Sequence, residues 1–448
     1  MIDEKKLSQN TYKEEFIKYR TVVLKALNRA LESVDPYNSV KKFVKRIDDK
    51  IEIDGKSYNL KDFSRIYVIA FGKASIKMFK AISEIVKVDS GVVVSNAFSD
   101  FELSNVRFIK GGHPIPDEKS VEAGEEILRL ARNTSESDLT FVLISGGGSA
   151  LVESPLIELS RLQELTKLLM KKGADINELN AVRKHLSRIK GGKLLKSLKG
   201  TVISLIISDV IFDPLDVIAS GPTYFDSSTF EDAVSILRKY NLNDEFDDVV
   251  KIFEEGLRGN IEETLKPGEK LLCAFENHII ASNYIANKAL LEFLKESGIN
   301  TFYLGPGIHG IASSVAKAIA GIGRSIDLGY IDIRKPTAIV FGGETTVEVK
   351  GNGIGGRNSE LTLYIAKHLE RTNFVFASIG TDGIDGVSPA AGAIADSQTL
   401  EKAKRLNLDI NMYLENNDSF TFFDKLGDAI ITGPTGTNVA DISVLLIF

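Results

Sequence analysis

Short apolar runs that end in glycine-rich turns recur along this chain of 448 residues. In the clearest example, Val142-Leu143-Ile144 leads into Ser145 and three glycines, and Ser149 then opens a segment with helical spacing. This order predicts a buried strand, a tight loop and the start of a helix. Similar turns follow other apolar runs at Gly72-Lys73, Gly111-Gly112-His113-Pro114, Gly342-Gly343-Glu344 and Gly380-Thr381-Asp382-Gly383. Strands that alternate with helices in this way predict an α/β fold with a doubly wound, mostly parallel sheet.

The length predicts at least two domains, because a single hydrophobic core rarely grows beyond about 300 residues. Residues 11–34 carry apolar positions at helical spacing, and Asp54-Gly55 predicts a hairpin turn between two short alternating runs. Glycine and proline interrupt a charged helical stretch at 227–268, and the strand–helix alternation restarts after it. We therefore expect an N-terminal Rossmann-like domain over 1–258 and a C-terminal α/β domain over 269–448.

Composition excludes several classes of protein. The net charge of −6 argues against a general nucleic-acid binder, which would usually present a basic face. The single cysteine, Cys273, lies in an apolar run and excludes a disulfide framework or a cysteine-rich metal site. The sequence shows no signal-peptide core and no apolar run long enough to cross a bilayer. We expect a soluble cytoplasmic protein without nucleic-acid or membrane partners; the sequence does not reveal the oligomeric state and allows a homodimer.

The glycine-rich turns predict a site for an anion. Ligands of open α/β sheets bind beyond the carboxyl ends of the strands, where glycine lets backbone N–H groups approach a phosphate or carboxylate. Lys73 follows a strand and a glycine, and a lysine there can reach a phosphate. The alternative is a set of flexible turns that bind nothing. The candidate phosphate- or nucleotide-binding residues are Gly72, Ser145, Gly146, Gly147, Gly148, Ser149, Gly355 and Gly356.

Residues 351–356 satisfy the pattern G-x-G-x-x-G between a strand and a helix, which is a weak signal for a dinucleotide site. Arg357 follows directly, and an arginine at the mouth of a glycine loop suits bidentate contact with phosphate. We favour phosphate contact, because an acidic partner for a ribose is not evident at the expected distance. No Walker A pattern occurs, so a P-loop fold is excluded.

Two groups of residues, one of aspartates and one on a basic helix face, complete the candidate site. Asp209 ends an apolar strand and Asp382 lies in a glycine turn, so either carboxylate could hold Mg²⁺, and Asp209 could accept a proton from a substrate hydroxyl. Asn180, Arg183 and Lys184 share a helix face and could hold a substrate carboxylate, although such a basic run is more often a solvated surface. The five histidines lack metal-ligand spacing, and His113 is interpreted as a structural turn residue.

Taken in order, the motifs resemble the type II glycerate kinases, the glycerate 2-kinases whose C-terminal portion is called the MOFRL domain. The resemblance spans nearly the whole chain and is carried by short motifs: Val34-Asp35-Pro36, Gly72-Lys73-Ala74, Gly112-His113-Pro114, Ser145–Leu151, Asn180 with Val182–Ser187, Ser208-Asp209-Val210, Ser220-Gly221-Pro222-Thr223, Gly342-Gly343-Glu344, Gly355–Asn358, Thr381-Asp382-Gly383 with Asp385-Gly386, and Gly433-Pro434-Thr435 with Thr437-Asn438. Single motifs are unspecific, whereas the ordered set is strongly specific.

The resemblance implies two α/β domains with the active site in a cleft between them. It implies transfer of phosphate from ATP, with Mg²⁺, to the 2-hydroxyl of D-glycerate, giving 2-phosphoglycerate and ADP. A lysine and an arginine important for activity in that family match Lys73 and Arg357. On this basis we expect Arg357→Ala to abolish turnover and leave the fold intact. The alternatives are an NAD(P)-dependent hydroxypyruvate reductase built on residues 351–356 and a non-catalytic sugar-phosphate sensor.

The chain departs from the family pattern at two places. After Asp385-Gly386 it has Val387-Ser388-Pro389 where the family usually has Pro-Thr-Asp, which removes a carboxylate. A metal role for this loop must then rest on Asp382 or Asp385. Near the C-terminus, Val439-Ala440-Asp441 stands where Val-Asn-Asp is usual.

Overall fold

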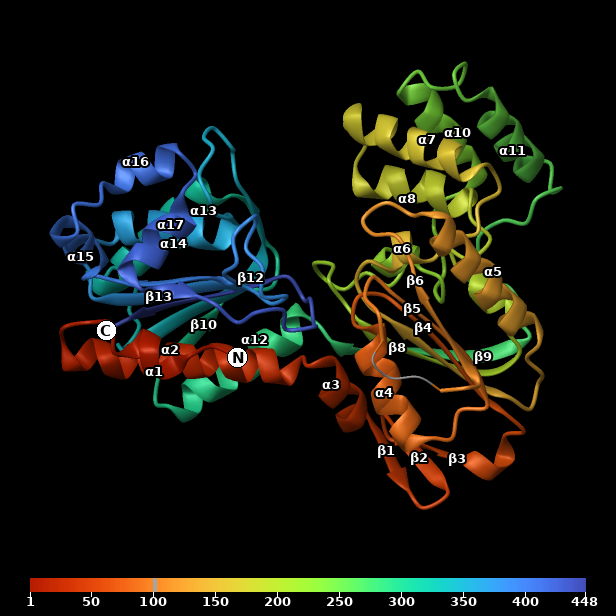
Figure 1. Cartoon of the computed structure of the whole chain (residues 1–448), viewed down its shortest axis with the longest axis horizontal. Coiled ribbons are helices and arrows are strands. Elements are labelled where there is room, and N and C mark those ends of the chain that lie inside the picture. Colours follow the sequence, from red (N-terminus) through yellow and green to blue (C-terminus); the bar gives the residue numbers. More distant parts are fainter. Residues whose placement is uncertain (100–102) are drawn as a thin grey trace. The chain divides into compact units, whose positions relative to one another are not determined.

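The computed structural model describes residues 1–99 and 103–448 and divides into two compact units (Figure 1). The central unit is Pro36–Ile280, and the terminal unit joins Met1–Asp35 to Ala281–Phe448. Both units combine helices with a β-sheet, so the predicted α/β class is confirmed.

The main sheet of the central unit has six strands in the order β6-β5-β4-β7-β8-β9. Strands β6, β5, β4, β7 and β8 pair in parallel, as the alternation of strands and helices predicted. The two middle strands, β4 and β7, are buried along their whole length, which is expected of parallel strands covered on both faces. The strands are β4 (Ile66–Phe71), β5 (Ser90–Ser95), β6 (Val106–Lys110), β7 (Leu139–Ile144), β8 (Gly200–Ile207) and β9 (Cys273–Ala281).

Helices and a small sheet surround this core. A three-stranded antiparallel sheet contains the hairpin predicted at Asp54-Gly55. Helices α7, α8, α10 and α11 pack around an apolar core of their own. The remaining elements of the unit are α3 (Pro36–Phe43), β1 (Val44–Ile47), β2 (Lys50–Ile53), β3 (Lys56–Asn59), η1 (Leu60–Asp62), α4 (Ser75–Ile85), α5 (Glu118–Arg132), α6 (Gly148–Leu151), α7 (Leu159–Lys171), α8 (Ile176–His185), α9 (Lys193–Ser197), η2 (Ile218–Ser220), α10 (Phe230–Lys239) and α11 (Asp247–Leu257).

The sheet of the terminal unit is mixed, in the order β10-β12-β16-β13-β14-β15, with β11 paired to β12. The C-terminal strand β16 lies between β12 and β13 and is antiparallel to both. In Figure 1, α2 and α12 cover one face of this sheet, and α13 and α14 cover the other. The strands are β10 (Asn300–Tyr303), β11 (Ile308–Ile311), β12 (Thr337–Thr346), β13 (Phe374–Gly380), β14 (Gly392–Asp396), β15 (Ala429–Ile430) and β16 (Asp441–Ile447). The helices are α1 (Glu4–Ser8), α2 (Glu14–Ser33), α12 (Asn283–Glu296), α13 (Ala312–Asp327), α14 (Arg357–His368), α15 (Thr399–Arg405), α16 (Ile410–Glu415) and α17 (Ser419–Leu426).

The N-terminal helix α2 explains why the units differ from the predicted ranges 1–258 and 269–448. Its apolar face is buried against α12 and β13, so residues 1–35 pack with the C-terminal half of the chain. Arg20 is fully buried there and pairs with Asp396 at 2.8 Å and with Asp428. The second boundary follows β9, because that strand completes the sheet of the central unit.

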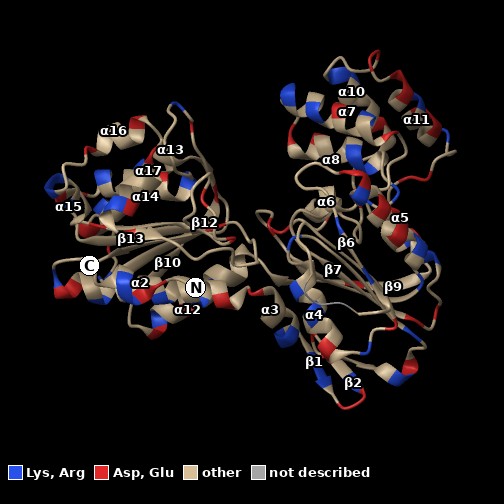
Figure 2. Ribbon diagram, in the orientation of Figure 1, with Lys and Arg blue, Asp and Glu red and all other residues tan. Residues whose placement is uncertain are grey.

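Charged residues of both signs are interspersed over the helices of each unit (Figure 2). Among the described residues, no helix is both long and apolar enough to span a bilayer.

Candidate functional site

The glycine turn after β7, residues 145–148, forms the centre of the candidate site in the central unit. Gly147 has a φ of 83°, a conformation that favours glycine. The turn after β4 joins it, because the N–H of Lys73 donates to the carbonyl of Gly146 at 2.9 Å and the N–H of Ala74 donates to Ser145 Oγ at 3.0 Å. The expectation that these two turns meet at the carboxyl edge of the sheet is therefore confirmed.

Three ionisable side chains gather at this glycine turn. Asp209, which follows β8, packs so closely on Gly146 that a Cβ there would lie 2.2 Å from its Oδ2. His113 and Lys73 lie over Gly147, where a Cβ would be 3.1 Å from Nε2 of the histidine and 3.4 Å from Cε of the lysine. Burial lowers the pKa of His113, and the charge of Lys73 adds to this effect. The side chains of His113, Lys73 and Asp209 thus surround one largely buried backbone turn, in which only Gly147 is partly exposed.

Arg183 on α8 brings a second cation to the turn. Its Nη2 donates to the carbonyl of Ser149 at 2.9 Å. Burial lowers the pKa of Arg183. The negative charge of nearby Glu153 opposes this lowering by electrostatic attraction. Within residues 1–99 and 103–448, no carboxylate forms an ion pair with Arg183 or with Lys73. Arg183 is partly buried and Lys73 is exposed, so the cost of burying an unpaired cation applies to Arg183, and its position fits a site that receives an anion.

Polar side chains link α8 to the same turn. Ser149 Oγ lies 2.8 Å from Ser220 Oγ, which in turn donates to Oδ1 of Asn180 at 3.1 Å. The predicted residues Asn180, Arg183 and Ser149 therefore lie together. Ser220 was noted only as part of a motif, since no local pattern shows that a residue 40 positions beyond Asn180 contacts its side chain.

Lys184 is a correction to the predicted substrate-binding set. It is buried and pairs with Asp226 at 2.9 Å. Burial alone would raise the pKa of Asp226, but Lys184 holds it below the usual value. The helical periodicity placed Lys184 beside Arg183, yet the fold turns it into the interior, where it stabilises the unit. Lys190 is likewise buried and paired, since its Nζ lies 2.5 Å from Glu153.

In the terminal unit, Arg357 begins α14 and is held by two carboxylates. Its Nε and Nη2 donate to Asp441 at 2.5 and 2.9 Å, and its Nη1 donates to Glu344 at 2.6 Å. Burial raises the pKa of Asp441 to about 6, although Arg357 opposes this shift. Arg357 is therefore a fixed and charge-compensated donor. The expectation that Arg357→Ala leaves the fold intact needs correction, because it would leave buried Asp441 without its partner.

The N-terminus of α14 already holds an anion of the protein itself. Buried Asp385 accepts hydrogen bonds from the N–H groups of Asn358 and Ser359, both at 2.8 Å. Its burial raises its pKa despite these bonds. Asp382 lies nearby, and its Oδ1 accepts from the N–H of Ile384 at 3.0 Å. Asp385 thus has a structural role, and a metal role for this loop rests on Asp382.

The G-x-G-x-x-G segment at 351–356 does not offer the backbone donors that a dinucleotide pyrophosphate needs. The N–H groups of Lys350 and Gly351 donate to Asn417, and those of Asn352 and Ile354 donate to Asn416 and Asp418. The predicted phosphate-binding role of Gly356 is also unsupported, because its N–H donates to Ser359 Oγ at 3.2 Å. Gly355 is packed against Ser419, where a Cβ would lie 2.4 Å from its Oγ.

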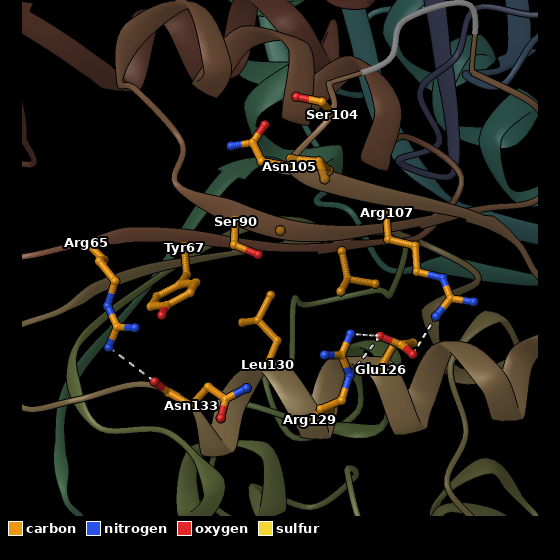
Figure 3. A pocket seen from close by; sticks show the side chains of 13 residues that line it. Arg65, Tyr67, Ser90, Ser104, Asn105, Arg107, Glu126, Arg129, Leu130 and Asn133 are labelled. Carbon is orange, nitrogen blue, oxygen red and sulfur yellow. Dashed lines mark hydrogen bonds and ion pairs between the residues drawn. The ribbon is translucent and has the colours of Figure 1, made fainter.

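A hollow of about 620 Å³ lies elsewhere in the central unit, where β4, β5 and β6 begin (Figure 3). Arg107 and Arg129 on its rim are directed at Glu126, as Figure 3 shows. Arg65 pairs with Asp138 at 2.9 Å. None of the site residues predicted from the sequence lines this hollow, and its arginines are paired with carboxylates of the protein. We therefore assign the candidate site to the glycine turn.

Carboxylates that could hold a metal are dispersed. Among the residues that the structure describes, no group of three or more His, Cys, Asp or Glu side chains is arranged to bind a metal ion. Mg²⁺ in phosphotransferases is commonly held by one or two carboxylates together with substrate phosphates. The predicted ligands Asp209 and Asp382 fit that mode of binding better than an all-protein metal site.

Comparison with known proteins identifies the family. A domain of unknown function, DUF4147, matches residues 22–254, and the MOFRL family matches residues 337–441. A protein of Pyrococcus horikoshii named glycerate 2-kinase is 41% identical over 432 residues, which cover 96% of this chain and 97% of that protein. This chain belongs to the glycerate 2-kinase family.

Other members agree with the fold. The crystal structure of a glycerate kinase from Thermotoga maritima matches with a TM-score of 0.85 and 36% identity, covering 96% of this chain and 100% of that one. A relative from Agrobacterium vitis is 37% identical over 391 residues, 86% of this chain and 87% of its own length. It carries hydroxypyruvate reductase as a provisional name. The names of family members thus include both enzyme activities considered from the sequence.

Proposed function

We propose that the protein is a glycerate 2-kinase that transfers phosphate from ATP to the 2-hydroxyl of D-glycerate. Membership of the glycerate 2-kinase family supports this activity. The observation that carries the proposal is the pair of cations, Lys73 and Arg183, that lie at the glycine turn without carboxylate partners among the described residues. Glycerate, 2-phosphoglycerate and ATP are all anions, and such a turn suits them.

The reaction requires mainly positioning and compensation of charge. The 2-hydroxyl oxygen of glycerate attacks the γ-phosphorus, its proton leaves, and the bond from that phosphorus to the bridging oxygen of ADP breaks. Lys73 would compensate charge on the transferred group, while Asn180 and Arg183 would hold the glycerate carboxylate. Asp209 would accept the hydroxyl proton or bind the metal. Arg357 would donate to phosphate oxygens through N–H groups that its carboxylate partners leave available.

Mg²⁺ would be held by Asp209 or Asp382 together with the phosphates of ATP, and it would supply compensation of phosphate charge. The free N–H groups of Gly146 and Gly147 fit the same proposal, since neither donates to any residue of the described chain. We assign no phosphate contact to Gly356, whose N–H is already used. We further propose a cytoplasmic enzyme, and the homodimer remains a prediction that analytical ultracentrifugation would test.

A direct assay tests the proposal. Purified protein with D-glycerate, ATP and Mg²⁺ is coupled to enolase without phosphoglycerate mutase, so that only 2-phosphoglycerate gives phosphoenolpyruvate. We expect turnover, and we expect Lys73→Met to lower kcat at least about 100-fold, as loss of an electrostatic group at a reacting centre commonly does. Lys80→Met, which removes an exposed lysine from helix α4, the helix that follows Lys73, is the matched control. Unchanged turnover in Lys73→Met would contradict the assignment.

The same protein distinguishes the alternatives. A hydroxypyruvate reductase would consume NADH when hydroxypyruvate is added, which we do not expect because residues 350–354 use their N–H groups internally. A sensor would bind glycerate or a sugar phosphate but release no ADP. NADH consumption without ADP formation would replace the kinase proposal with the reductase.

A further inference from the structure

Ser220 occupies an unusual place in the central unit. It is fully buried, and it follows Ala219 in a short stretch where both residues have left-handed backbone conformations, with φ of 50° and 62°. Residues other than glycine pay about 1–2 kcal/mol for this conformation, so it persists only where surrounding contacts require it. The conformation directs Ser220 Oγ at two polar side chains, Ser149 after the glycine turn and Asn180 on α8.

The hydrogen bonds of Ser220 have one consistent direction. The Oδ1 atom of Asn180 can only accept, so the single hydroxyl proton of Ser220 is donated to it over 3.1 Å. Ser220 then has no proton left for Ser149, which lies 2.8 Å away. Ser149 must therefore donate to Ser220. The chain runs from Ser149 through Ser220 to Asn180.

The direction of these hydrogen bonds fixes the orientation of the side-chain amide of Asn180. Because Oδ1 faces Ser220, the two N–H groups on Nδ2 face away from it, and they donate to no residue in the described part of the chain. Arg183 lies one helical turn further along α8, on the same face. Arg183 donates one N–H to the carbonyl of Ser149 and forms no ion pair with a carboxylate among the described residues. Two neighbouring side chains thus present only donors.

We propose that Ser220 is a positioning residue that orients the amide donors of Asn180 toward the substrate carboxylate bound by Arg183. This inference rests on the proposed glycerate kinase activity and adds the residue that sets its preference for an acid. An amide turned the other way would present an oxygen and repel a carboxylate. The oriented amide and the guanidinium together form a donor set that a neutral polyol cannot match in charge.

The test is Ser220→Ala, which removes one oxygen atom and leaves the backbone in place. We expect the KM for D-glycerate to rise about 10-fold, while the KM for ATP and kcat change less than about 2-fold, because only the substrate carboxylate loses an oriented donor. An unchanged KM for D-glycerate in an active variant would overturn this inference alone. Failure of the wild type to phosphorylate glycerate would instead overturn the proposed function, and this inference with it.

Two further variants exclude a merely structural effect. Thr223→Val removes a partly buried bond, from Thr223 Oγ1 to Oδ1 of Asn277 at 2.8 Å, and we expect it to lower the melting temperature without changing either KM. Asn180→Ala should itself raise the KM for D-glycerate, and adding Ser220→Ala to it should have no further effect, since Ser220 acts through Asn180. Equal effects of Ser220→Ala in both backgrounds would refute the proposed route.

Discussion

Replacing Arg357 by Met tests how the terminal unit holds its buried carboxylate. Methionine keeps a long side chain but removes the guanidinium that donates to Asp441 at 2.5 and 2.9 Å. Asp441 is only 5% exposed, so it cannot turn to water for compensation. Glu344, the second partner of Arg357, is half exposed and should tolerate the loss. The main consequence should therefore be an unpaired buried carboxylate.

The expected size and pH dependence follow from the pKa of Asp441. Burial raises this pKa to about 6 in the folded protein, although Arg357 opposes the shift, whereas the unfolded chain has an aspartate pKa of about 3.9. The raised value means that stability is fully present below the unfolded pKa and is lost as pH rises through the folded pKa. A shift of about two units corresponds to about 3 kcal/mol.

Without Arg357 the pKa of Asp441 should rise further, so keeping this carboxylate charged should cost the folded variant more free energy. We expect Arg357→Met to lower the free energy of unfolding by about 3–5 kcal/mol at pH 7.5, the usual cost of breaking a buried pair. At pH 5 the carboxyl group binds a proton, and the loss should be less than half as large. Asp441→Asn added to Arg357→Met should recover most of the stability at pH 7.5, since a neutral amide replaces the charge.

Urea denaturation followed by circular dichroism measures these differences, because the chain has no tryptophan to report by fluorescence. The wild type, both single variants and the double variant are compared at pH 5.0 and 7.5. Equal losses for Arg357→Met at the two pH values, with no recovery in the double variant, would refute this account of Asp441.

The remaining predictions concern other charges and one backbone position. Arg183→Met should weaken glycerate binding at least about 10-fold in calorimetry, yet leave the free energy of unfolding within about 1 kcal/mol, since its cation lacks a described carboxylate partner; a large loss of stability would contradict this. Lys184→Met should do the reverse, costing about 3–5 kcal/mol by stranding Asp226 while the KM for glycerate stays within about 2-fold. Arg20→Met should destabilise the terminal unit by about 3–5 kcal/mol in urea denaturation, and wild-type stability would show that the buried ion pairs contribute nothing. Ala440→Gly should raise stability by about 0.5–1 kcal/mol, because φ is 63° at this residue; a lower melting temperature would argue against backbone strain there.

Much of the central unit could be predicted from the sequence, because its signals are local. Apolar runs of strand length that end in glycine turns gave the parallel strands, and the carboxyl-edge rule brought Lys73 to the turn at residues 145–148. The terminal unit was less accessible. The helix at residues 14–33 was recognisable as amphipathic, but nothing in its own pattern shows that its apolar face packs on α12, about 250 residues further along the chain.

The errors in the site have the same physical origin. Arg183 and Lys184 are neighbours of equal charge, and only the fold shows that Asp226, 42 residues later, pairs with the second and not the first. The glycines at 351–356 matched a phosphate-binding pattern, yet residues 416–418 accept hydrogen bonds from the N–H groups of residues 351–354. At Ala440, by contrast, a feature of the sequence agrees with the structure. The sequence showed it as a departure from the family's asparagine, and its left-handed conformation is one that asparagine tolerates better than alanine.

Lys73, Arg183 and Arg357 should have different roles in the proposed mechanism, because only Arg357 is paired with carboxylates of the described chain. Lys73 and Arg183 have no described carboxylate partner, so an anion at the glycine turn would gain their full attraction, which salt should weaken. Arg357 is compensated by Asp441 and Glu344, and it brings little net charge to a phosphate. Its fixed guanidinium can supply direction, since two carboxylates hold its plane. Loss of Arg183 should therefore weaken binding of glycerate in a salt-dependent way, whereas loss of Arg357 should act on the geometry of transfer and lower kcat at any ionic strength.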